Sequence, residues 1–340
     1  MKALQIASWG GALRLTDVPR PKPAEGQVLV RVEACGIGLT VLNCMQGQLG
    51  DDASYLPLTP GHEFVGVIED VGTGVDAGRI GERIGAYFYL ICGECSNCLR
   101  ERDSLCLRFR GNVGVAIDGG FAEWAVLPAL NAIAVPDEVE PALATTIPDA
   151  IATPVHVARR SGMGPGSRVV VLAAGGGVGV HMVQVAQSFG ADVVGLDVVP
   201  AKLEYLEREF EIISMDSSDF GSLELPRSWG GQADVIVDLY GRRPAQRWAI
   251  EHLSACGSLV CLTTFRDQQF DVTSRELVQR QLAILGSRYN SRFEQGLAAE
   301  LVRSGRVRPV VSRTVSVDDV AQTLAQVREG SLIGRAALVW

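Results

Sequence analysis

Residues 168–181 read Arg168-Val-Val-Val-Leu-Ala-Ala-Gly-Gly-Gly-Val-Gly-Val-His181, and this stretch decides the fold. An apolar run from Val169 to Leu172 leads directly into a glycine-rich turn, and apolar side chains then recur at helical spacing up to Phe189. Strand, glycine turn and helix in this order predict the first βα unit of a dinucleotide-binding fold.

The turn matches the pattern A-x-G-x-x-G, with Ala174 in place of the first glycine. In such a turn the middle glycine lets the backbone approach a pyrophosphate, and the last lets the helix pack against the strand. We assign these roles to Gly176 and Gly179, with Gly177 and Val178 completing the phosphate-binding turn. The alternative is an ordinary glycine-rich βα turn, since the pattern alone is a weak signal.

An acidic residue strengthens the nucleotide interpretation. Asp197 lies eighteen residues beyond Gly179, at the end of the next predicted strand. A carboxylate at this place accepts hydrogen bonds from the adenine-ribose hydroxyls and repels a 2′-phosphate. The sequence therefore predicts NAD(H) rather than NADP(H).

The pattern of predicted secondary structure changes near residue 150. Residues 1–150 contain short β-rich runs separated by Pro and Gly clusters, which predict a β-rich domain. Beyond them, residues 151–285 alternate strand-like and helical segments, including a helix from Pro200 to Phe210, and predict a doubly wound parallel sheet. The fold class is therefore α/β with an additional β-rich domain.

Four cysteines are close together in the sequence, in a loop spanning residues 92–106. They follow the spacing C-x2-C-x2-C-x7-C and are Cys92, Cys95, Cys98 and Cys106. Four thiolates at this spacing can close a tetrahedron around Zn²⁺, and such a closed site leaves no position for water or substrate. We predict one structural zinc ion; an iron–sulfur centre and buried free thiols are the alternatives.

Composition excludes several classes of protein. The 31 basic and 39 acidic residues give a net charge of −8, so there is no basic footprint for a nucleic acid. The uncharged stretch 169–191 contains too many glycines and polar residues for a membrane span, and no signal peptide is visible at the N-terminus. Eight cysteines in 340 residues do not suggest a disulfide framework, so we expect a cytoplasmic protein.

The cysteine loop, the Gly61-His-Glu63 triplet and the nucleotide motif together resemble the zinc alcohol dehydrogenases of the medium-chain dehydrogenase/reductase superfamily. The resemblance implies a GroES-like catalytic domain, a Rossmann domain, a C-terminal segment 286–340 that returns to the first domain, and a homodimer or homotetramer. It also implies a small-molecule substrate and a ribose-side role for Lys202. Residues 148–154 resemble the segment that supplies a zinc ligand, which places Asp149 at that ligand and Thr153 near the nicotinamide.

The family pattern fails at the first ligand of the catalytic zinc. Aligning residues 34–43 puts Gly38 where the ligating cysteine belongs, with Thr40 at the family's hydroxyl position. His62 and Asp149 match the other two ligands, and Glu63 is a third candidate. Because a catalytic zinc normally has three protein ligands and a water, the second zinc is a hypothesis that Gly38 weakens. Cys35 and Cys44 are the remaining candidate ligands, and we expect both to be packing residues instead.

Three functions follow from these residues. The first is an NAD(H)-dependent oxidoreductase acting on a small or medium alcohol–carbonyl pair, with Thr40, His62 and Asp149 as catalytic residues. The second is a zinc-free site that reduces an activated C=C bond or an iminium, because hydrogen bonds are weaker electrophiles than a bound cation. The third is an NADH-binding protein that has lost catalysis. Residues near Tyr87–Leu90 and Tyr289 are expected to line the substrate pocket, and the substrate itself is left open.

Overall fold

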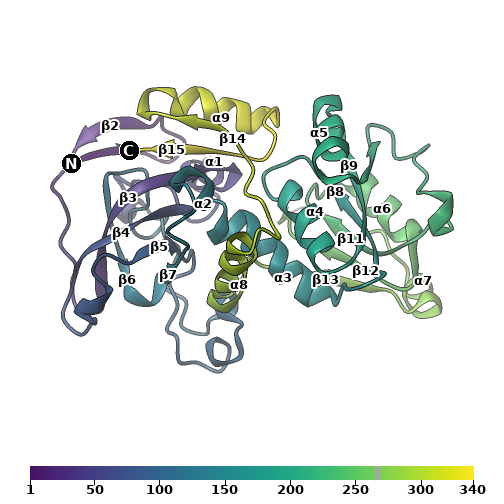
Figure 1. The fold of residues 1–340 in the computed structure, drawn as a ribbon, viewed down its shortest axis with the longest axis horizontal. Coiled ribbons are helices and arrows are strands. Elements are labelled where there is room, and N and C mark those ends of the chain that lie inside the picture. The colour runs from purple at the N-terminus through teal and green to yellow at the C-terminus, as the bar shows by residue number, and fades with distance from the viewer. Residues whose placement is uncertain (265–268) are drawn as a thin grey trace. The chain divides into compact units, whose positions relative to one another are not determined.

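The computed structural model describes residues 1–264 and 269–340, which form two compact units. The first unit contains Met1–Ala152, Asn290–Gly305 and Pro309–Trp340, and the second contains Thr153–Tyr289 and Arg306–Arg308. The first is β-rich and the second is built on a parallel sheet, so the predicted fold class is confirmed (Figure 1).

The first unit is organised around a seven-stranded sheet. Its strands run in the order β14-β15-β3-β4-β5-β7, and β6 also pairs with β3. The strands are β3 (Gln27–Ile37), β4 (Phe64–Val71), β5 (Arg83–Ala86), β6 (Trp124–Pro128), β7 (Ala132–Ala134), β14 (Val311–Val315) and β15 (Arg335–Val339). A separate antiparallel pair is formed by β1 (Lys2–Gln5) and β2 (Arg14–Asp17).

The central strand of this sheet, β3, shows why the sequence forms it. Val28, Leu29 and Val30 are buried, and from Val30 the buried valines alternate with polar positions, since Arg31 is exposed and Val32 is buried. Such alternation places one face of the strand on the core. β15 pairs antiparallel with the end of β3, with Ala336 opposite Ile37. The C-terminal strand is thereby fixed beside the end of β3.

Short helices complete the first unit. They are α1 (Leu39–Met45), α2 (Pro141–Ala144), α8 (Arg292–Arg303) and α9 (Val320–Glu329). A π-helical turn, η6 (Ile147–Ile151), precedes α3, and α8 packs against it and against β7. α8 begins with a reciprocal capping box between Ser291 and Glu294, which satisfies otherwise unpaired N–H groups of its first turn.

The second unit contains a six-stranded parallel sheet in the order β10-β9-β8-β11-β12-β13, with helices on both faces (Figure 1). This is the doubly wound order 3-2-1-4-5-6 of dinucleotide-binding folds. The strands are β8 (Arg168–Leu172), β9 (Asp192–Asp197), β10 (Ile213–Asp216), β11 (Ala233–Asp238), β12 (Leu253–Cys261) and β13 (Ala283–Gly286). The helices are α3 (Ala152–Ser161), α4 (Gly179–Ser188), α5 (Pro200–Phe210), α6 (Arg243–His252) and α7 (Ser274–Arg280).

The central strand β8 explains why this sheet is covered on both sides. Val169, Val170 and Val171 are fully buried, as expected for a parallel strand whose two faces both contact helices. α5 starts at Pro200, whose missing N–H costs nothing in the first turn of a helix. The sequence predicted the bounds of α5 as they are observed.

Candidate functional site

The glycine turn connects the end of β8 to the start of α4. A Cβ atom on Gly179 would lie 2.2 Å from the carbonyl oxygen of Ala173, and one on Gly176 would lie 3.2 Å from the same oxygen. The backbone is therefore too close at Gly179 for any side chain. Such packing brings the first turn of the helix, with its unpaired N–H groups, up to the end of the strand, where a pyrophosphate binds. Gly177 lies within this turn, and its carbonyl oxygen is 2.7 Å from Nδ1 of His181.

The Asp197 carboxylate connects the turn to the end of the next strand, β9, through hydrogen bonds. It accepts hydrogen bonds from the backbone N–H of Gly175 at 2.9 Å, of Val198 at 2.9 Å and of Val199 at 3.2 Å. A carboxylate offers only acceptors, so its remaining capacity suits the hydroxyl donors of a ribose, and its charge opposes a phosphate. Lys202 is buried in the first turn of α5, and a Cβ on Gly175 would meet its side chain at 2.5 Å. The residues present fit an adenine dinucleotide.

Two threonines were also predicted to serve the nicotinamide. Thr153 lies in the first turn of α3 and is buried. Thr40 lies in the first turn of α1, two residues after Gly38, and is half-buried. They belong to different units of the chain.

The four-cysteine loop brings its sulfurs together. The Sγ–Sγ distances are 3.5 Å for Cys95–Cys98 and Cys92–Cys106, 3.9 Å for Cys95–Cys106 and 4.0 Å for Cys92–Cys98. A tetrahedron of thiolates at the usual zinc–sulfur distance has edges of about 3.8 Å. Backbone N–H groups of Cys98 and Leu107 lower the pKa of Cys95 to about 6, which favours the thiolate that a metal requires. The loop fits one structural zinc ion.

A second cluster, which we call the His62 cluster, comprises His62, Glu63, Asp149 and Arg335. His62 and Glu63 directly precede β4, and Asp149 lies in the π-helical turn η6. Nε2 of His62 lies 3.2 Å from Oδ2 of Asp149, and the His62 ring packs on Phe88 with centroids 4.5 Å apart. His62, Glu63 and Asp149 each offer one possible ligand atom, and these three atoms lie within 4.8 Å of one another.

Arg335 is the member of this cluster that sequence reasoning missed. Its Nη2 donates to Oε1 of Glu63 at 2.7 Å and lies 3.8 Å from Oδ2 of Asp149. Burial raises the pKa of Glu63, and the charge of Arg335 opposes that rise. The two paired residues are 272 positions apart in sequence, so no local motif could have revealed them.

Gly38 lies directly beside this guanidinium. A Cβ on Gly38 would be 2.9 Å from Nη1 of Arg335 and 3.1 Å from its Cζ. A cysteine at position 38 would therefore require the end of the Arg335 side chain to shift. The two other candidate ligands are buried thiols: burial raises the pKa of Cys44 to about 12 and that of Cys35 well above its ordinary range.

The His62 cluster does not fit a catalytic zinc ion in this arrangement. Such an ion normally needs three protein ligands with room for water, and here Glu63 is already paired with a guanidinium that also faces Asp149. Placing a divalent cation among these groups would put it beside a fixed positive charge. The cluster already contains its own cation.

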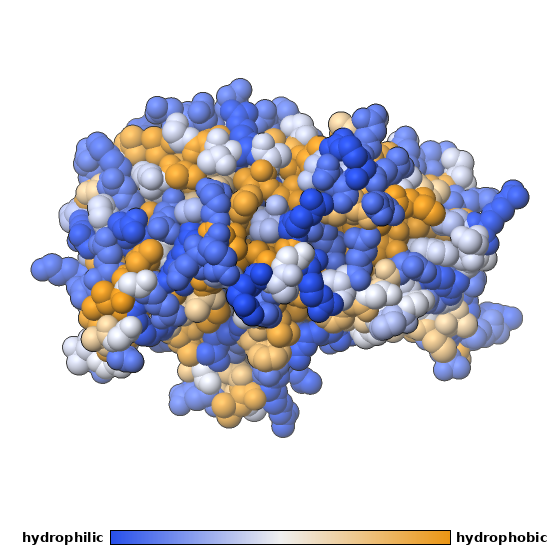
Figure 2. Space-filling view, viewed as in Figure 1, coloured by the Kyte–Doolittle hydropathy of each residue, from blue (hydrophilic) through white to orange (hydrophobic). Residues whose placement is uncertain are grey.

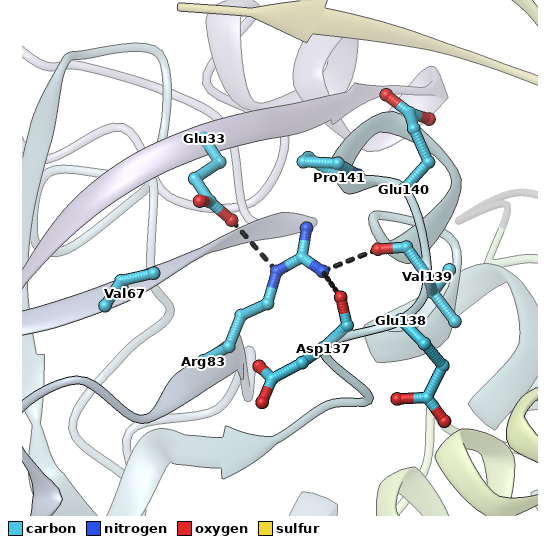
Figure 3. A pocket seen from close by; sticks show the side chains of 8 residues that line it. All are labelled: Glu33, Val67, Arg83, Asp137, Glu138, Val139, Glu140 and Pro141. Atoms are coloured by element: carbon cyan, nitrogen blue, oxygen red, sulfur yellow. Dashed lines mark hydrogen bonds and ion pairs between the residues drawn. The ribbon is translucent and has the colours of Figure 1, made fainter.

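A separate surface hollow of about 410 Å³ surrounds Arg83 (Figure 3). Half of its lining residues are acidic, and the lining comprises Glu33, Val67, Arg83, Asp137, Glu138, Val139, Glu140 and Pro141. Arg83 donates to Oε2 of Glu33 at 2.9 Å and to the carbonyl oxygens of Asp137 and Val139 at 3.1 and 2.5 Å. These hydrogen bonds hold the chain after β7 against the sheet, so the hollow has a structural explanation.

On the face shown in Figure 2, hydrophilic residues are interspersed with smaller apolar areas. Among the residues that the structure describes, no helix combines the length and the apolar character needed to cross a bilayer.

A β-rich unit bearing a histidine–carboxylate cluster, together with a doubly wound unit bearing a nucleotide turn, is the combination found in two-domain nucleotide-dependent oxidoreductases. The family model of the alcohol dehydrogenase GroES-like domain matches residues 24–137, and that of the zinc-binding dehydrogenases matches residues 177–303. The chain belongs to the alcohol dehydrogenase family of the medium-chain dehydrogenase/reductase superfamily.

Its relatives extend over the whole chain. An alcohol dehydrogenase of Geobacillus stearothermophilus is 29% identical over 99% of this chain and 98% of its own length. An acryloyl-coenzyme A reductase of Sulfurisphaera tokodaii is 25% identical over 98% of both chains. The crystal structure of an NAD-dependent alcohol dehydrogenase superposes with a TM-score of 0.91 at 27% identity and covers both chains completely.

Proposed function

We propose that this protein is an NAD(H)-dependent oxidoreductase that interconverts a small or medium organic alcohol and its carbonyl compound. The observation that carries the proposal is the glycine turn held to Asp197, because a carboxylate at this place selects the unphosphorylated ribose. The NAD-dependent alcohol dehydrogenase with the same fold supports the choice of cofactor. NAD(H), when bound, supplies or accepts the hydride.

The chain's own residues divide the work. Gly176, Gly177, Val178 and Gly179 bind the pyrophosphate, Asp197 and Lys202 bind the adenine ribose, and Thr153 supports the nicotinamide. In the reducing direction the carbonyl carbon gains a hydride and the π-electron pair moves to its oxygen. Thr40 or solvent then supplies a proton to that oxygen, and the hydride would come from NADH bound at the glycine turn. Asp149 holds the imidazole of His62 through the contact between them, and His62 faces the substrate oxygen.

The test measures cofactor binding and turnover on the same preparation. Fluorescence titration should show NADH binding at least about tenfold more tightly than NADPH. NADH oxidation should then appear with some members of a panel of aldehydes and ketones. A His62→Ala variant should keep NADH binding and lose turnover by a factor of about a hundred. A protein that binds no NADH would end the proposal.

A second candidate function is reduction of a C=C bond conjugated to a carbonyl. Two observations favour it: Gly38 removes a ligand that polarisation of a plain ketone by zinc needs, and one relative of full length is an acryloyl-coenzyme A reductase. In this reaction the β carbon gains the hydride, the electron pair moves through the α carbon to the carbonyl oxygen as an enolate, and the α carbon takes a proton. Charge spread over an enolate needs less stabilisation than an alkoxide.

Enones and acryloyl thioesters added to the panel separate the two functions. Turnover of enones and thioesters with none of saturated ketones would favour the second function, and the reverse result the first. NADH binding with no turnover on either panel would identify an NADH-binding protein without catalysis. We also propose that the protein is a homodimer or homotetramer, which sedimentation would test. We further propose that it is cytoplasmic, which cell fractionation would test.

A further inference from the structure

We propose that Asn290 is a positioning residue of the His62 cluster: it holds the segment that carries Asp149 and the segment that packs on His62, and it thereby sets the geometry of the His62–Asp149 pair. This inference rests on the proposed function and deepens it. Asn290 directly precedes the capping box of α8, and it belongs to the first unit together with both segments. Neither the sequence motifs nor the family match assigns it a role.

The first segment is the π-helical turn η6, which carries Asp149. Nδ2 of Asn290 donates a hydrogen bond of 3.0 Å to the carbonyl oxygen of Pro148, the residue directly before Asp149. Asn290 is 142 positions further along the chain and only 1% exposed, so this hydrogen bond is a long-range contact in the core. π-helical turns are rare and are frequently found at functional sites. A shift of the Pro148 carbonyl would move the Asp149 carboxylate with it.

The second segment directly follows β5 and contains Tyr87 and Phe88. The Tyr87 hydroxyl donates to the backbone carbonyl oxygen of Asn290 at 2.7 Å, and Tyr87 is fully buried. The next residue, Phe88, packs its ring against the His62 imidazole with centroids 4.5 Å apart. Asn290 is therefore bonded to both segments at once, to one through its side chain and to the other through its backbone.

These segments also pack closely on each other. A Cβ atom on Gly85 of β5 would lie 2.9 Å from Cγ of Pro148, so the glycine allows η6 to approach the strand. Gln295, in the first turn of α8, donates from Nε2 to the carbonyl oxygen of Gly85 at 3.1 Å. Two buried amides, those of Asn290 and Gln295, thus fasten the start of α8 to η6 and to β5.

The backbone that carries Asn290 is itself fixed. The next residue, Ser291, forms the capping box with Glu294, and the N–H of Arg292 donates to Oδ2 of Asp103 at 2.9 Å. Catalytic groups must be held within about 0.5 Å of their productive positions, and the residues that support them must be fixed as well. Asn290 meets this requirement.

The amide of Asn290 is not explained by stability alone. Its Oδ1 is buried and has no hydrogen-bond partner among the residues that the structure describes. A buried acceptor of this kind lowers the stability of a fold. An apolar side chain of similar size would avoid this cost, so we infer that the position is occupied by asparagine for the donor Nδ2.

The first experiment measures turnover of the purified full chain with a substrate from the aldehyde, ketone and enone panels. Asn290→Leu should lower kcat at least about tenfold and change the Kd for NADH less than about twofold. In the His62→Ala background, the same substitution should change the residual rate less than about twofold, because Asn290 acts through the His62–Asp149 pair. Equal losses in both backgrounds would overturn the inference and leave the proposed oxidoreductase intact, since a loosened fold would lower both rates.

The matched control is Thr323→Val in α9. It removes another buried side-chain hydrogen bond of the first unit, which runs from Oγ1 of Thr323 to the carbonyl oxygen of Asp319 at 2.9 Å. Both variants should keep Tm within about 4 °C of the unmodified protein, but only Asn290→Leu should lower kcat. A tenfold loss of kcat in Thr323→Val would overturn the inference, because the loss of any buried hydrogen bond would then be sufficient.

The second experiment needs no turnover and observes His62 directly. In protein carrying ¹³C at the imidazole Cε1, the His62 resonance is identified by its absence in His62→Ala. The other three histidines lie in the second unit and are His156, His181 and His252. In Asn290→Leu the His62 resonance should shift by more than its linewidth, because its contacts with Phe88 and Asp149 both change, while the other three should stay in place.

The two experiments separate the inference from the proposed function. An unchanged His62 resonance in Asn290→Leu would overturn the inference, whatever the turnover. A shifted His62 resonance in a protein that turns over no substrate would support the positioning of His62 by Asn290 and would remove the proposed function. If Asn290→Leu does not fold, Asn290→Ala removes the same donor without adding volume and gives the same readouts.

Discussion

The nucleotide turn and the His62 cluster are built in different ways: one depends on the local backbone, and the other depends on side chains that are far apart in sequence. The turn is made by backbone: Gly179 is required because a Cβ would lie 2.2 Å from a carbonyl oxygen of the preceding strand. The cluster is made by side chains from distant parts of the chain, and Arg335 reaches Glu63 across 272 positions. The backbone site keeps its second and third glycines, Gly176 and Gly179, whereas the side-chain site has Gly38 close to the guanidinium of Arg335.

The four-cysteine loop is the third kind of site, made by side chains that are close in sequence, and it allows the largest expected effect. Cys98→Ser should lower the zinc content by one ion per chain and the free energy of unfolding by roughly 3 kcal/mol or more, or about 10 °C in Tm. Calorimetry with parallel metal analysis measures both. The matched control is Cys256→Ser, an exposed cysteine outside the loop. Unchanged zinc content in Cys98→Ser would show that the metal lies elsewhere.

The turn itself gives the next largest effect. Gly179→Ala should weaken NADH binding about a hundredfold, equivalent to about 2.8 kcal/mol, because the new Cβ pushes the helix off the strand. Gly164→Ala is the control, since a Cβ there meets nothing within 4 Å. Titration of NADH fluorescence measures both variants, and circular dichroism checks that they fold. NADH affinity retained in Gly179→Ala would show that the close approach of helix and strand at Gly179 is not needed for binding.

These three sites also show what the sequence could predict. The glycine turn, Asp197 and the four cysteines lie within short segments whose spacing reflects the geometry they need, so their arrangement follows from residue type and order. The bounds of α5 follow from Pro200 and its apolar stripe for the same reason. The register of β15 on β3 depends on pairing over the whole first unit, so the contact between Arg335 and Gly38 has no local signature. The departure at Gly38 was visible in the sequence, but the residue that fills the space was not.

Asp197 is a side chain that supports the backbone turn, because its carboxylate accepts a hydrogen bond from the N–H of Gly175. Asp197→Ala removes three hydrogen bonds to the turn and its flank, and we expect NADH affinity to fall by about tenfold to thirtyfold. NADPH affinity should fall less, because the repulsion of the 2′-phosphate disappears as well. Asp192→Ala at the exposed start of the same strand should change neither affinity. An equal loss for both nucleotides would argue against a ribose contact.

The smallest expected effect concerns the Arg168–Asp234 ion pair in the second unit. Unlike the His62 cluster, this pair is partly exposed to solvent. Arg168 donates to both carboxylate oxygens of Asp234, 66 positions away, at 2.6 and 3.0 Å. These hydrogen bonds lower the pKa of Asp234 to about 2. Because the folded pKa lies below the ordinary value of 3.8, the stabilisation is complete above about pH 4 and is lost as the pH falls toward 2.

Asp234→Asn should therefore lower the free energy of unfolding by about 1 kcal/mol at pH 7, a figure reduced for solvent screening because the Asp234 side chain is 35% exposed. Denaturant melts at pH 7, 5, 4 and 3 should show the difference between the two proteins constant down to about pH 4 and shrinking below it. A difference that grows on acidification would mean that the carboxylate is destabilising and that burial outweighs its pairing. A loss of several kcal/mol in the free energy of unfolding at pH 7 would contradict this prediction. It would mean that the partly exposed Arg168–Asp234 pair stabilises the protein as much as a buried ion pair.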